Sequence, residues 1–418
     1  MDFQIFDYGM NGEGVARLDN KIVLIDNALI GETIDAEISL DKGNYCFGKV
    51  NKILKESINR TTPPCPYFFD CGGCNLQHMK YLEQLKFKTL LIKKTIKKIL
   101  NIDVAVNDCI ASDFKYNYRN KMSFNFNETS SGFYKEKSKA IIEIKKCILA
   151  DEEINNIYLN FKKFLKNKEN IAKNTQKYIK NLVIRKISNQ ILIGIVSTKP
   201  LNLTDFYKNF DKENVGIFNV VNTRKDSVVL SGKVIHLFGI KEIEITNFGL
   251  TYFVDLIGFH QTNINIQNKI YKKVLDYITP NSFVVNGFSG QGLLSAVLAT
   301  KAKKVVGIEI NKNSHASAER LKLENNIKNL KNICGDFNKE IKSYKPHLLV
   351  LDPAKKGVGK DFLDKITAKE IVYISCNPIA MCKDLKILLN NYTIEEITPF
   401  DMFPNTKNVE TVLHLKHK

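Results

Sequence analysis

The chain of 418 residues is long enough for two to four domains, and a content of 44% hydrophobic and 25% charged residues is ordinary for a globular protein. The 62 Lys and Arg residues outnumber the 44 Asp and Glu residues, which gives a formal net charge of +18. That excess favours a polyanionic partner such as nucleic acid, although a genome whose codons favour lysine would produce the same composition.

The sequence has no feature of a membrane or secreted protein. No apolar run approaches the roughly 20 residues that span a bilayer, and the first residues lack the basic start and apolar core of a signal peptide. Nine cysteines, an odd number, argue for metal binding or catalysis rather than for a disulfide framework. We therefore expect a cytoplasmic protein without a membrane partner.

Residues 1–58 have the pattern of a small β-barrel. Short strands are predicted over 21–25, 33–39 and 46–50, and turn-forming Asn, Asp and Gly residues separate them. Small barrels of this kind often bind single-stranded or structured RNA. A barrel that only packs on its neighbour is the alternative.

Closely spaced cysteines after the barrel suggest a metal centre. They are Cys65, Cys71 and Cys74, with two glycines between the last two. Clustered thiolates bind zinc or an iron–sulfur cluster, and either centre needs a fourth ligand. Cys147 is the best candidate for this ligand, because Cys109 has no partner residues around it in the sequence.

The region that follows mixes a basic helix with strands. Residues 81–100 predict a basic amphipathic helix, and Tyr118-Arg-Asn-Lys121 leads into an alternating strand whose basic and aromatic groups suit RNA contacts. Residues 162–173, rich in Lys and Asn, predict a solvated helix face. Further strands are expected over 181–185, 191–196 and 228–230.

The last third alternates strands and helices, which predicts a doubly wound α/β domain. A strand over 283–286 leads into a turn with Gly290 and Gly292, and the next strand ends at Glu309. An acid at that place can accept hydrogen bonds from both ribose hydroxyls. Without a further phosphate-binding glycine, the pattern suits S-adenosylmethionine better than a dinucleotide. Asp336, after the following strand, could read an adenine amino group.

Residues 371–374 predict a buried parallel strand, with Cys376 at its C-terminal end. Asn377 can cap the helix that follows, and Pro378 suits its first position. The thiol would face the crevice where open α/β sheets bind ligands, beside a helix N-terminus that favours the thiolate. A buried structural cysteine is the alternative.

Two carboxylates complete the candidate site. Asp352 follows a buried strand and is expected in the crevice, unless it only caps the next turn. Glu410 lies in an apolar stretch of a final hairpin strand over 401–415. Such surroundings raise the pKa of a carboxyl group and let it act as a base.

Together these stretches resemble the RNA (uracil-5-)-methyltransferase family, in its branch with a TRAM domain and an iron–sulfur cluster. The matching stretches are Gly12-Glu-Gly14, CPYFFDCGGC with Cys147, Tyr118-Arg-Asn-Lys121, Phe259-His-Gln261-Thr-Asn263, the Gly290-Gln-Gly292 turn, Asp352-Pro353, SCNP at 375–378 and DMFP…VET at 401–411.

The resemblance implies a multidomain fold. It consists of a small OB-like, TRAM-like RNA-binding barrel (1–58), a central α+β RNA-binding domain with an Fe–S cluster (59–255) and a Rossmann-like S-adenosylmethionine-dependent methyltransferase domain (256–418). The helix over 81–100 is a candidate to pack on the catalytic domain. We expect a monomer.

The resemblance also implies the chemistry. Cys376 would be the nucleophile that adds to uracil C6, and Glu410 the base that removes the C5 proton. The target base would be flipped into the crevice. The implied methyl-donor contacts are Gln261, Phe288, Glu309 and Asp352, with Asp336 as a further candidate. The implied ligands of a [4Fe-4S] cluster are Cys65, Cys71, Cys74 and Cys147.

Several positions depart from the family pattern. Asn286 replaces an acid, Leu293 a small or polar residue, and Lys355 an arginine. Asn405 and Asn408 stand where histidines are common. These changes leave the nucleophile and the base in place and bear on donor affinity and substrate contacts.

We expect an enzyme that forms 5-methyluridine in RNA, with 23S ribosomal RNA as the first candidate substrate and transfer RNA as the alternative. A catalytically silent RNA-binding ribosome-assembly factor is a second reading. An amino-group methyltransferase with an Asp-Pro-Pro-aromatic loop is a third, and the absence of that aromatic residue after Asp352 disfavours it.

Overall fold

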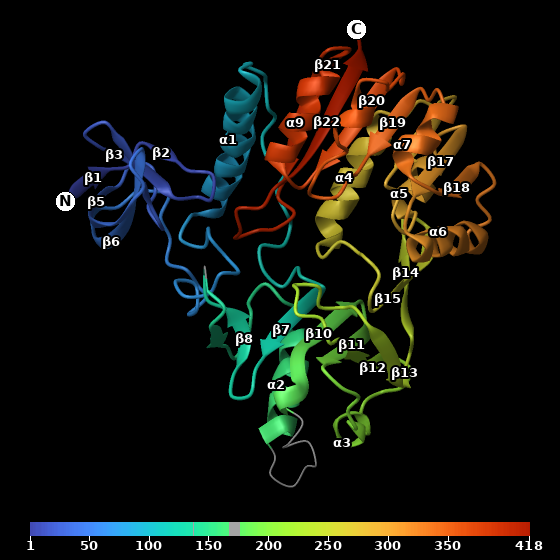
Figure 1. The fold of residues 1–418 in the computed structure, drawn as a ribbon, viewed down its shortest axis with the longest axis horizontal. Coiled ribbons are helices and arrows are strands. Elements are labelled where there is room, and N and C mark those ends of the chain that lie inside the picture. Colours follow the sequence, from blue (N-terminus) through green and yellow to red (C-terminus); the bar gives the residue numbers. More distant parts are fainter. Residues whose placement is uncertain (137, 167–175) are drawn as a thin grey trace.

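The computed structural model describes residues 1–136, 138–166 and 176–418, and Figure 1 shows its sheets and helices in order along the chain. The N-terminal sheet has the strand order β1-β5-β6-β4-β3-β2. Its strands are β1 (Asp2–Gln4), β2 (Asp7–Tyr8), β3 (Gly14–Leu18), β4 (Lys21–Ile25), β5 (Thr33–Asp41) and β6 (Tyr45–Lys55). Strands β1 and β3 touch, so the sheet curls into a small barrel around an apolar core. The strands predicted from the sequence lie within β4, β5 and β6.

The central region is a seven-stranded sheet of order β13-β12-β11-β10-β7-β8-β9. Its strands are β7 (Lys121–Phe126), β8 (Ser131–Tyr134), β9 (Ile141–Glu143), β10 (Ile179–Ile187), β11 (Gln190–Ser197), β12 (Val215–Val221) and β13 (Lys233–Gly239). Helix α2 (Glu152–Lys166) packs on it, with the Tyr158 ring stacked on Phe124 at 4.0 Å between centroids. The short helix α3 (Thr204–Tyr207) and the 3-10 turn η2 (Gln176–Tyr178) lie in its connections.

One predicted strand of this region is wrong. Residues 228–230 form a loop, and β13 begins only at Lys233. The Asn222 side-chain amide donates to the carbonyls of Val228 and Val229, both at 2.8 Å, and Asp226 accepts from the Val228 N–H at 3.1 Å. These side chains occupy the backbone groups that a strand would need. Residues 167–173 of the predicted solvated helix face lie outside the described residues.

The C-terminal sheet has the order β18-β17-β16-β19-β20-β22-β21. Its strands are β16 (Phe283–Gly287), β17 (Lys304–Glu309), β18 (Leu330–Cys334), β19 (Leu348–Leu351), β20 (Glu370–Ser375), β21 (Tyr392–Phe400) and β22 (Glu410–His417). The first five run parallel, and β22 is antiparallel to both neighbours. The predicted strand over 401–415 is therefore shorter, because residues 401–409 form the connection between β21 and β22.

Helices cover this sheet, and a ribbon connects it to the central region. The helices are α4 (Ile264–Asp276), α5 (Leu293–Ala299), α6 (Lys312–Glu324), α7 (Phe337–Glu340), α8 (Lys360–Leu363) and α9 (Pro378–Leu388), with the 3-10 turn η3 (Ile341–Ser343). The ribbon is β14 (Glu242–Asn247) paired with β15 (Leu250–Asp255). None of the helices in the described part of the chain has the length and apolar character needed to cross a membrane.

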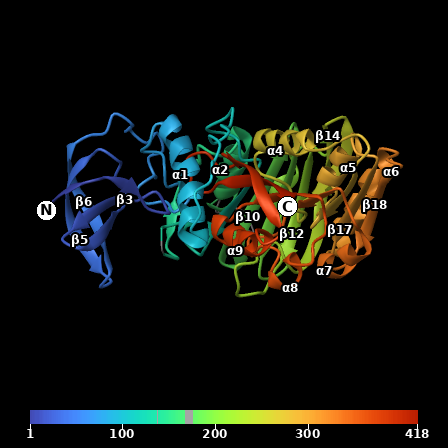
Figure 2. The ribbon, with the colours of Figure 1, turned by 90° about the horizontal axis from the view of Figure 1, so that it is seen from above.

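Helix α1 (Tyr81–Leu100) has the bounds predicted from the sequence and lies between the barrel and the C-terminal sheet (Figure 2). It packs against α9 and β21, so its inner face belongs to the core of the C-terminal sheet. On the other side, the Tyr8 hydroxyl of the barrel donates to Glu83 at 2.8 Å. The boundaries of 58 and 255 between three domains stay predictions, since α1 belongs in space to the sheet after the second boundary.

One contact of α1 has consequences for stability. The side chains of Lys88 and Asp401 form an ion pair with no solvent exposure on either side, and the Lys88 ammonium also donates to the Phe403 carbonyl at 3.1 Å. Removing one partner of a buried pair leaves the other charge unpaired in a low dielectric.

We expect Lys88→Met to lower the free energy of unfolding, measured by urea denaturation, by about 3–5 kcal/mol. The matched control is Lys97→Met on the same helix, whose partner Asp103 is largely exposed, and it should change stability by less than about 1 kcal/mol. A Lys88→Met loss no larger than that of the control would contradict this view of the ion pair.

Candidate functional site

The candidate site lies along the C-terminal edge of the parallel strands. The Gly-rich turn follows β16, Glu309 ends β17, Asp352 follows β19, and Cys376 follows β20. Because parallel strands present their carboxyl ends on one edge of a sheet, the fold brings these four segments together. Sequence reasoning predicted this convergence.

The Gly-rich turn, called the donor cradle below, has a backbone conformation that lets a ligand approach it closely. Phe288, Gly290 and Gly292 have φ angles of 60°, 55° and 85°, in the left-handed region. A Cβ atom at Gly292 would lie 2.6 Å from the Cβ of Ala318 on α6, so this position needs glycine. The turn therefore brings bare backbone up to the space in front of β16 and β17.

Glu309 is tied to this turn. Its carboxylate accepts from the Gly290 N–H at 2.9 Å and from the Asn311 N–H at 2.7 Å. Each carboxylate oxygen has a second lone pair, so Glu309 can still accept from ribose hydroxyls.

Phe288 and Asp336 lie beside each other in the fold. The Phe288 ring is half-buried and packs against Phe337, with 4.9 Å between centroids. Asp336 caps α7 by accepting from the Asn338 N–H at 3.0 Å. One Asp336 oxygen thus has a structural partner, and the other, which no hydrogen bond from the described residues reaches, can take the predicted adenine contact.

Polar atoms without partners lie behind the turn. The Asn286 amide donates to Ser295 at 2.9 Å, but its oxygen has no partner among the described residues. Both side-chain polar atoms of Asn332 also lack a partner there. A Cβ added at Gly307 would lie within 3.0 Å of both the Ser295 hydroxyl and the Asn332 oxygen, so these groups gather around one glycine. Buried polar atoms without partners fit a polar ligand at this edge.

Gln261 lies in the loop between β15 and α4. The Asn120 amide donates to the Gln261 carbonyl at 2.9 Å, and the buried Arg185 donates to the Gly258 carbonyl at 2.6 Å. A Cβ at Gly258 would collide with the Gln291 amide at 2.3 Å, so this loop lies directly against the Gly-rich turn. The central sheet therefore holds the loop that carries Gln261.

Cys376, Glu410 and Asp352 form a group of mutually interacting acids. Burial, and then the charge of Glu410, raise the pKa of the Cys376 thiol to about 11. Burial and the charge of Asp352 raise the pKa of Glu410 to about 8, and burial raises the pKa of Asp352 to about 7. Lys355, which sequence reasoning noted only as a departure, is the cation that acts on both Cys376 and Glu410.

These values correct one prediction and agree with another. The helix N-terminus was expected to favour the Cys376 thiolate, but the pKa of this thiol is raised. The Asn377 side chain already accepts from the N–H groups of Ile379 and Ala380, and Pro378 has no N–H to donate. The raised pKa predicted for Glu410 from its apolar surroundings does agree with the structure.

The loop 401–409 presents Glu410 and is fixed from several sides. Besides Lys88, the Gln84 side chain of α1 accepts from the Asn405 N–H at 2.9 Å. The Tyr118 hydroxyl donates to the Pro404 carbonyl at 3.1 Å, and Asn263, the cap of α4, donates to the Met402 carbonyl at 3.1 Å. Sequence reasoning quoted Tyr118 and Asn263 within motifs but did not foresee this use.

Asn405 shows why one departure from the family pattern is tolerated. Its φ angle is 68°, a conformation that asparagine adopts more readily than most residues. Its side chain donates to the Lys115 carbonyl at 2.8 Å and accepts from the Gln84 amide at 3.2 Å. Asn405 therefore adopts the left-handed backbone conformation of this turn, and both polar groups of its side chain are hydrogen-bonded.

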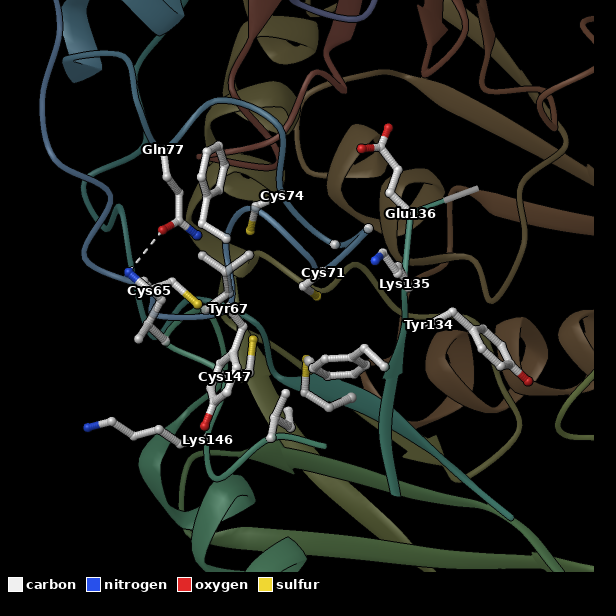
Figure 3. A pocket seen from close by; sticks show the side chains of 18 of the residues that line it. Cys65, Tyr67, Cys71, Cys74, Gln77, Tyr134, Lys135, Glu136, Lys146 and Cys147 are labelled. Carbon is white, nitrogen blue, oxygen red and sulfur yellow. Dashed lines mark hydrogen bonds between the residues drawn. The ribbon is translucent and has the colours of Figure 1, made fainter. Parts of the chain in front are cut away.

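The four cysteines predicted to bind a metal centre surround one cavity of about 460 Å³ (Figure 3). Cys65, Cys71 and Cys74 come from the segment before α1, Cys147 comes from the segment before α2, and their sulfur atoms point into the same space. Burial raises the pKa of all four thiols, that of Cys74 to about 12. Within residues 1–136, 138–166 and 176–418, no group of three or more His, Cys, Asp or Glu side chains is arranged to hold a metal ion.

Arg119 links this cavity to the loop 401–409. It lines the cavity, and its backbone N–H donates to the Leu149 carbonyl at 2.9 Å, close to Cys147 in the chain. Its guanidinium lies 5.9 Å from the centre of the Phe403 ring, and its buried Nε has no partner among the described residues.

Comparisons with known proteins agree with this geometry. The family model for tRNA (uracil-5-)-methyltransferase matches residues 80–418, and that for the TRAM domain matches residues 5–50. An RNA methyltransferase of Clostridium acetobutylicum is 33% identical over 99% of this chain and 97% of its own length, and one of Clostridium tetani is 32% identical over 97% and 94%.

A solved structure extends the agreement to the fold. The Pyrococcus abyssi tRNA (uracil-54, C5)-methyltransferase, in complex with S-adenosyl-L-homocysteine, superposes with a TM-score of 0.80 at 25% identity, covering 99% of this chain and all of that one. The resemblance stated from the sequence is thereby confirmed for the family and for its TRAM domain, and the iron–sulfur cluster stays a prediction. The chain belongs to the tRNA (uracil-5-)-methyltransferase family, and it is an S-adenosylmethionine-dependent RNA methyltransferase with an N-terminal TRAM domain.

Proposed function

We propose that the enzyme methylates C5 of a uracil in RNA and gives 5-methyluridine by way of a covalent adduct with Cys376. The observation that carries this proposal is the grouping of Cys376, Glu410 and Asp352 at the edge that also holds the donor cradle. A nucleophile and two carboxyl groups of raised pKa at one place are the groups that the reaction needs.

S-adenosylmethionine supplies an electrophilic methyl group when it is bound. The residues proposed to hold it are Gln261, Phe288, Glu309, Asp352 and Asp336. The partnerless polar atoms of Asn286 and Asn332 support a polar ligand there.

In the proposed reaction, Cys376, Asp352 and Glu410 act in turn. The Cys376 sulfur bonds to C6 while its proton passes to Asp352, the carboxylate besides Glu410 whose charge acts on this thiol. The C5=C6 electron pair becomes available at C5, which forms the new carbon–carbon bond to the methyl group as the bond from that methyl group to the donor sulfur breaks; the electron pair of the broken bond stays on the sulfur, and S-adenosylhomocysteine is the leaving group. Glu410 takes the C5 proton, and the electron pair left behind restores the double bond and expels the Cys376 sulfur.

The raised pKa of Glu410 suits this role. A base whose pKa of about 8 lies near neutrality is strong enough to remove a carbon-bound proton and is still partly ionised at pH 7.

We propose that the four-thiol cavity holds a [4Fe-4S] cluster ligated by Cys65, Cys71, Cys74 and Cys147. Four thiols spread around a cavity of about 460 Å³ suit a larger polynuclear centre. The partnerless buried Nε of Arg119 places positive charge where four thiolate ligands would bring negative charge.

We propose 23S ribosomal RNA as the substrate, because the pairing of TRAM barrel and cysteine cavity favours that branch. Transfer RNA is the second candidate, because the Pyrococcus abyssi enzyme of the same overall fold is a tRNA methyltransferase. We also propose that the enzyme acts as a monomer in the cytoplasm.

The first prediction from the proposed function concerns the substrate. Mass-spectrometric mapping of 5-methyluridine, with and without the gene, should show complete loss at one or two positions of 23S ribosomal RNA. Loss only in transfer RNA would keep the chemistry and change the substrate. No loss in either RNA would contradict the proposed function and favour a silent assembly factor.

The second prediction concerns the adduct. Glu410→Gln should accumulate a covalent protein–RNA complex with ordinary uridine, because Cys376 can add to C6 but the C5 proton stays in place. Denaturing gel electrophoresis with labelled RNA and donor measures it.

Cys376→Ala should give no complex, even with 5-fluorouridine, and should lower methylation by at least about 10⁴-fold. Cys46→Ala, in the barrel core, is the control and should behave as wild type. Full activity of Cys376→Ala would favour the amino-group methyltransferase.

The third prediction concerns the metal centre. Anaerobically purified protein should be brown and contain about four iron atoms per chain, measured by elemental analysis. Cys74→Ser should lose most of the iron, whereas Cys109→Ser, a buried thiol outside the cavity, should retain it. Zinc in place of iron would refute the cluster.

A further inference from the structure

A second cavity, of about 400 Å³, lies where the barrel meets α1 and the start of α9. The barrel contributes the turn with Met10, α1 contributes Leu90 and Lys98, and Ile379 of α9 completes the lining. In Figure 2 the barrel and α1 lie next to each other, and α1 packs on α9. The cavity therefore opens at the junction of three elements and belongs to neither the donor cradle nor the cysteine cavity.

The walls of this cavity are apolar and partly aromatic. The Tyr8 and Phe87 rings meet edge to face at 5.8 Å, and both contribute to the lining. Met10 and Ile379 at the mouth are 40% and 41% exposed, so apolar surface faces open space there. Such a surface suits the flat face of an unpaired nucleobase, which stacks on aromatic and apolar side chains.

The charged residues that line the cavity, Asp7, Lys94 and Lys98, leave one net positive charge at its rim. Lys98 is exposed, and Lys94 is held in place by Asp7 and by the Tyr8 carbonyl at 3.1 Å. Lysines around an apolar pocket allow a phosphate backbone to pass over the rim while its base enters the pocket. The net charge of +18 adds to this attraction.

The position relates the cavity to the reaction. Ile379 stands in the first turn of α9, three residues after Cys376 in the chain. A flipped uridine at Cys376 would leave neighbouring nucleotides close to this mouth, and base-modifying enzymes commonly select their target through such neighbours.

We propose that this cavity binds an unpaired nucleobase of the substrate RNA that lies near the flipped uridine. The inference rests on the proposed action on RNA and adds a site for a second base. Through this site, the junction of barrel, α1 and α9 contributes to the choice of RNA sequence.

The experiment measures binding by fluorescence anisotropy for the full chain with two labelled 12-nucleotide RNAs. One is all uridine, and the other keeps one central uridine with abasic residues elsewhere. Leu90→Trp fills the cavity and should weaken binding of the all-uridine RNA about tenfold, while binding of the abasic RNA stays within twofold.

The matched control is Leu82→Trp, the same change at a 73% exposed position of α1 outside the cavity, and it should alter neither affinity. Met10→Ala tests the opposite wall without added bulk and should weaken only the all-uridine complex, about threefold. Circular dichroism melting confirms that each variant folds.

Equal weakening with both RNAs, or no weakening in either cavity variant, would overturn the proposal. Because the readout is binding, this outcome is distinguishable from failure of the proposed function. If the cavity variants show no base-specific effect while 5-methyluridine is still formed, only the cavity proposal fails. If no 5-methyluridine is formed, the base-specific effect on binding can still be measured, and only the proposed function fails.

Discussion

The buried ion pair between Lys88 and Asp401 is the contact on which the arrangement of the site depends. It joins residues 313 positions apart in the chain and fixes the start of the loop that ends at Glu410. The same helix donates and accepts hydrogen bonds at Asn405 through Gln84. Separating the two side chains would leave a buried charge without its partner, which is energetically costly. Helix α1 therefore acts as the support of the catalytic loop.

The barrel is attached to the same support. Tyr8 bonds to Glu83 on α1, and Lys407 of the loop donates to Asn11 of the barrel at 2.7 Å. These contacts fix the position of the barrel, and of RNA bound to it, relative to the loop that presents Glu410. The cysteine cavity reaches this loop from the opposite side through Arg119 and the Phe403 ring. The loop 401–409 is thus in contact with the barrel, with α1 and with the segment that carries the cysteines.

The electrostatics of the site favour the protonated form of each of its three acidic groups. Burial raises the pKa of Cys376, Glu410 and Asp352; the charge of Asp352 further raises the pKa of Glu410, and the charges of both carboxylates further raise that of Cys376. Lys355 offers one compensating positive charge. A proton can consequently move among these groups without leaving two negative charges side by side. A helix N-terminus whose N–H groups are already bonded to Asn377 supplies little of this compensation.

The sequence by itself determined the elements and the residues with chemistry. The periodicity of residues 81–100 predicted α1 with its bounds, and the strand–turn patterns predicted the edge that carries Glu309, Asp352 and Cys376. These follow from local rules: apolar spacing, glycine in left-handed turns, and the common edge of parallel strands.

Only the tertiary structure decided how those residues are held and charged. The pKa of Cys376 depends on Glu410, 34 positions later, and the loop that presents Glu410 depends on α1, some 300 positions earlier. Likewise, residues 228–230 have strand propensity, but hydrogen bonds from Asn222 and Asp226 hold them in a loop. Desolvation and long-range pairing arise only when distant segments meet, so no local pattern encodes them.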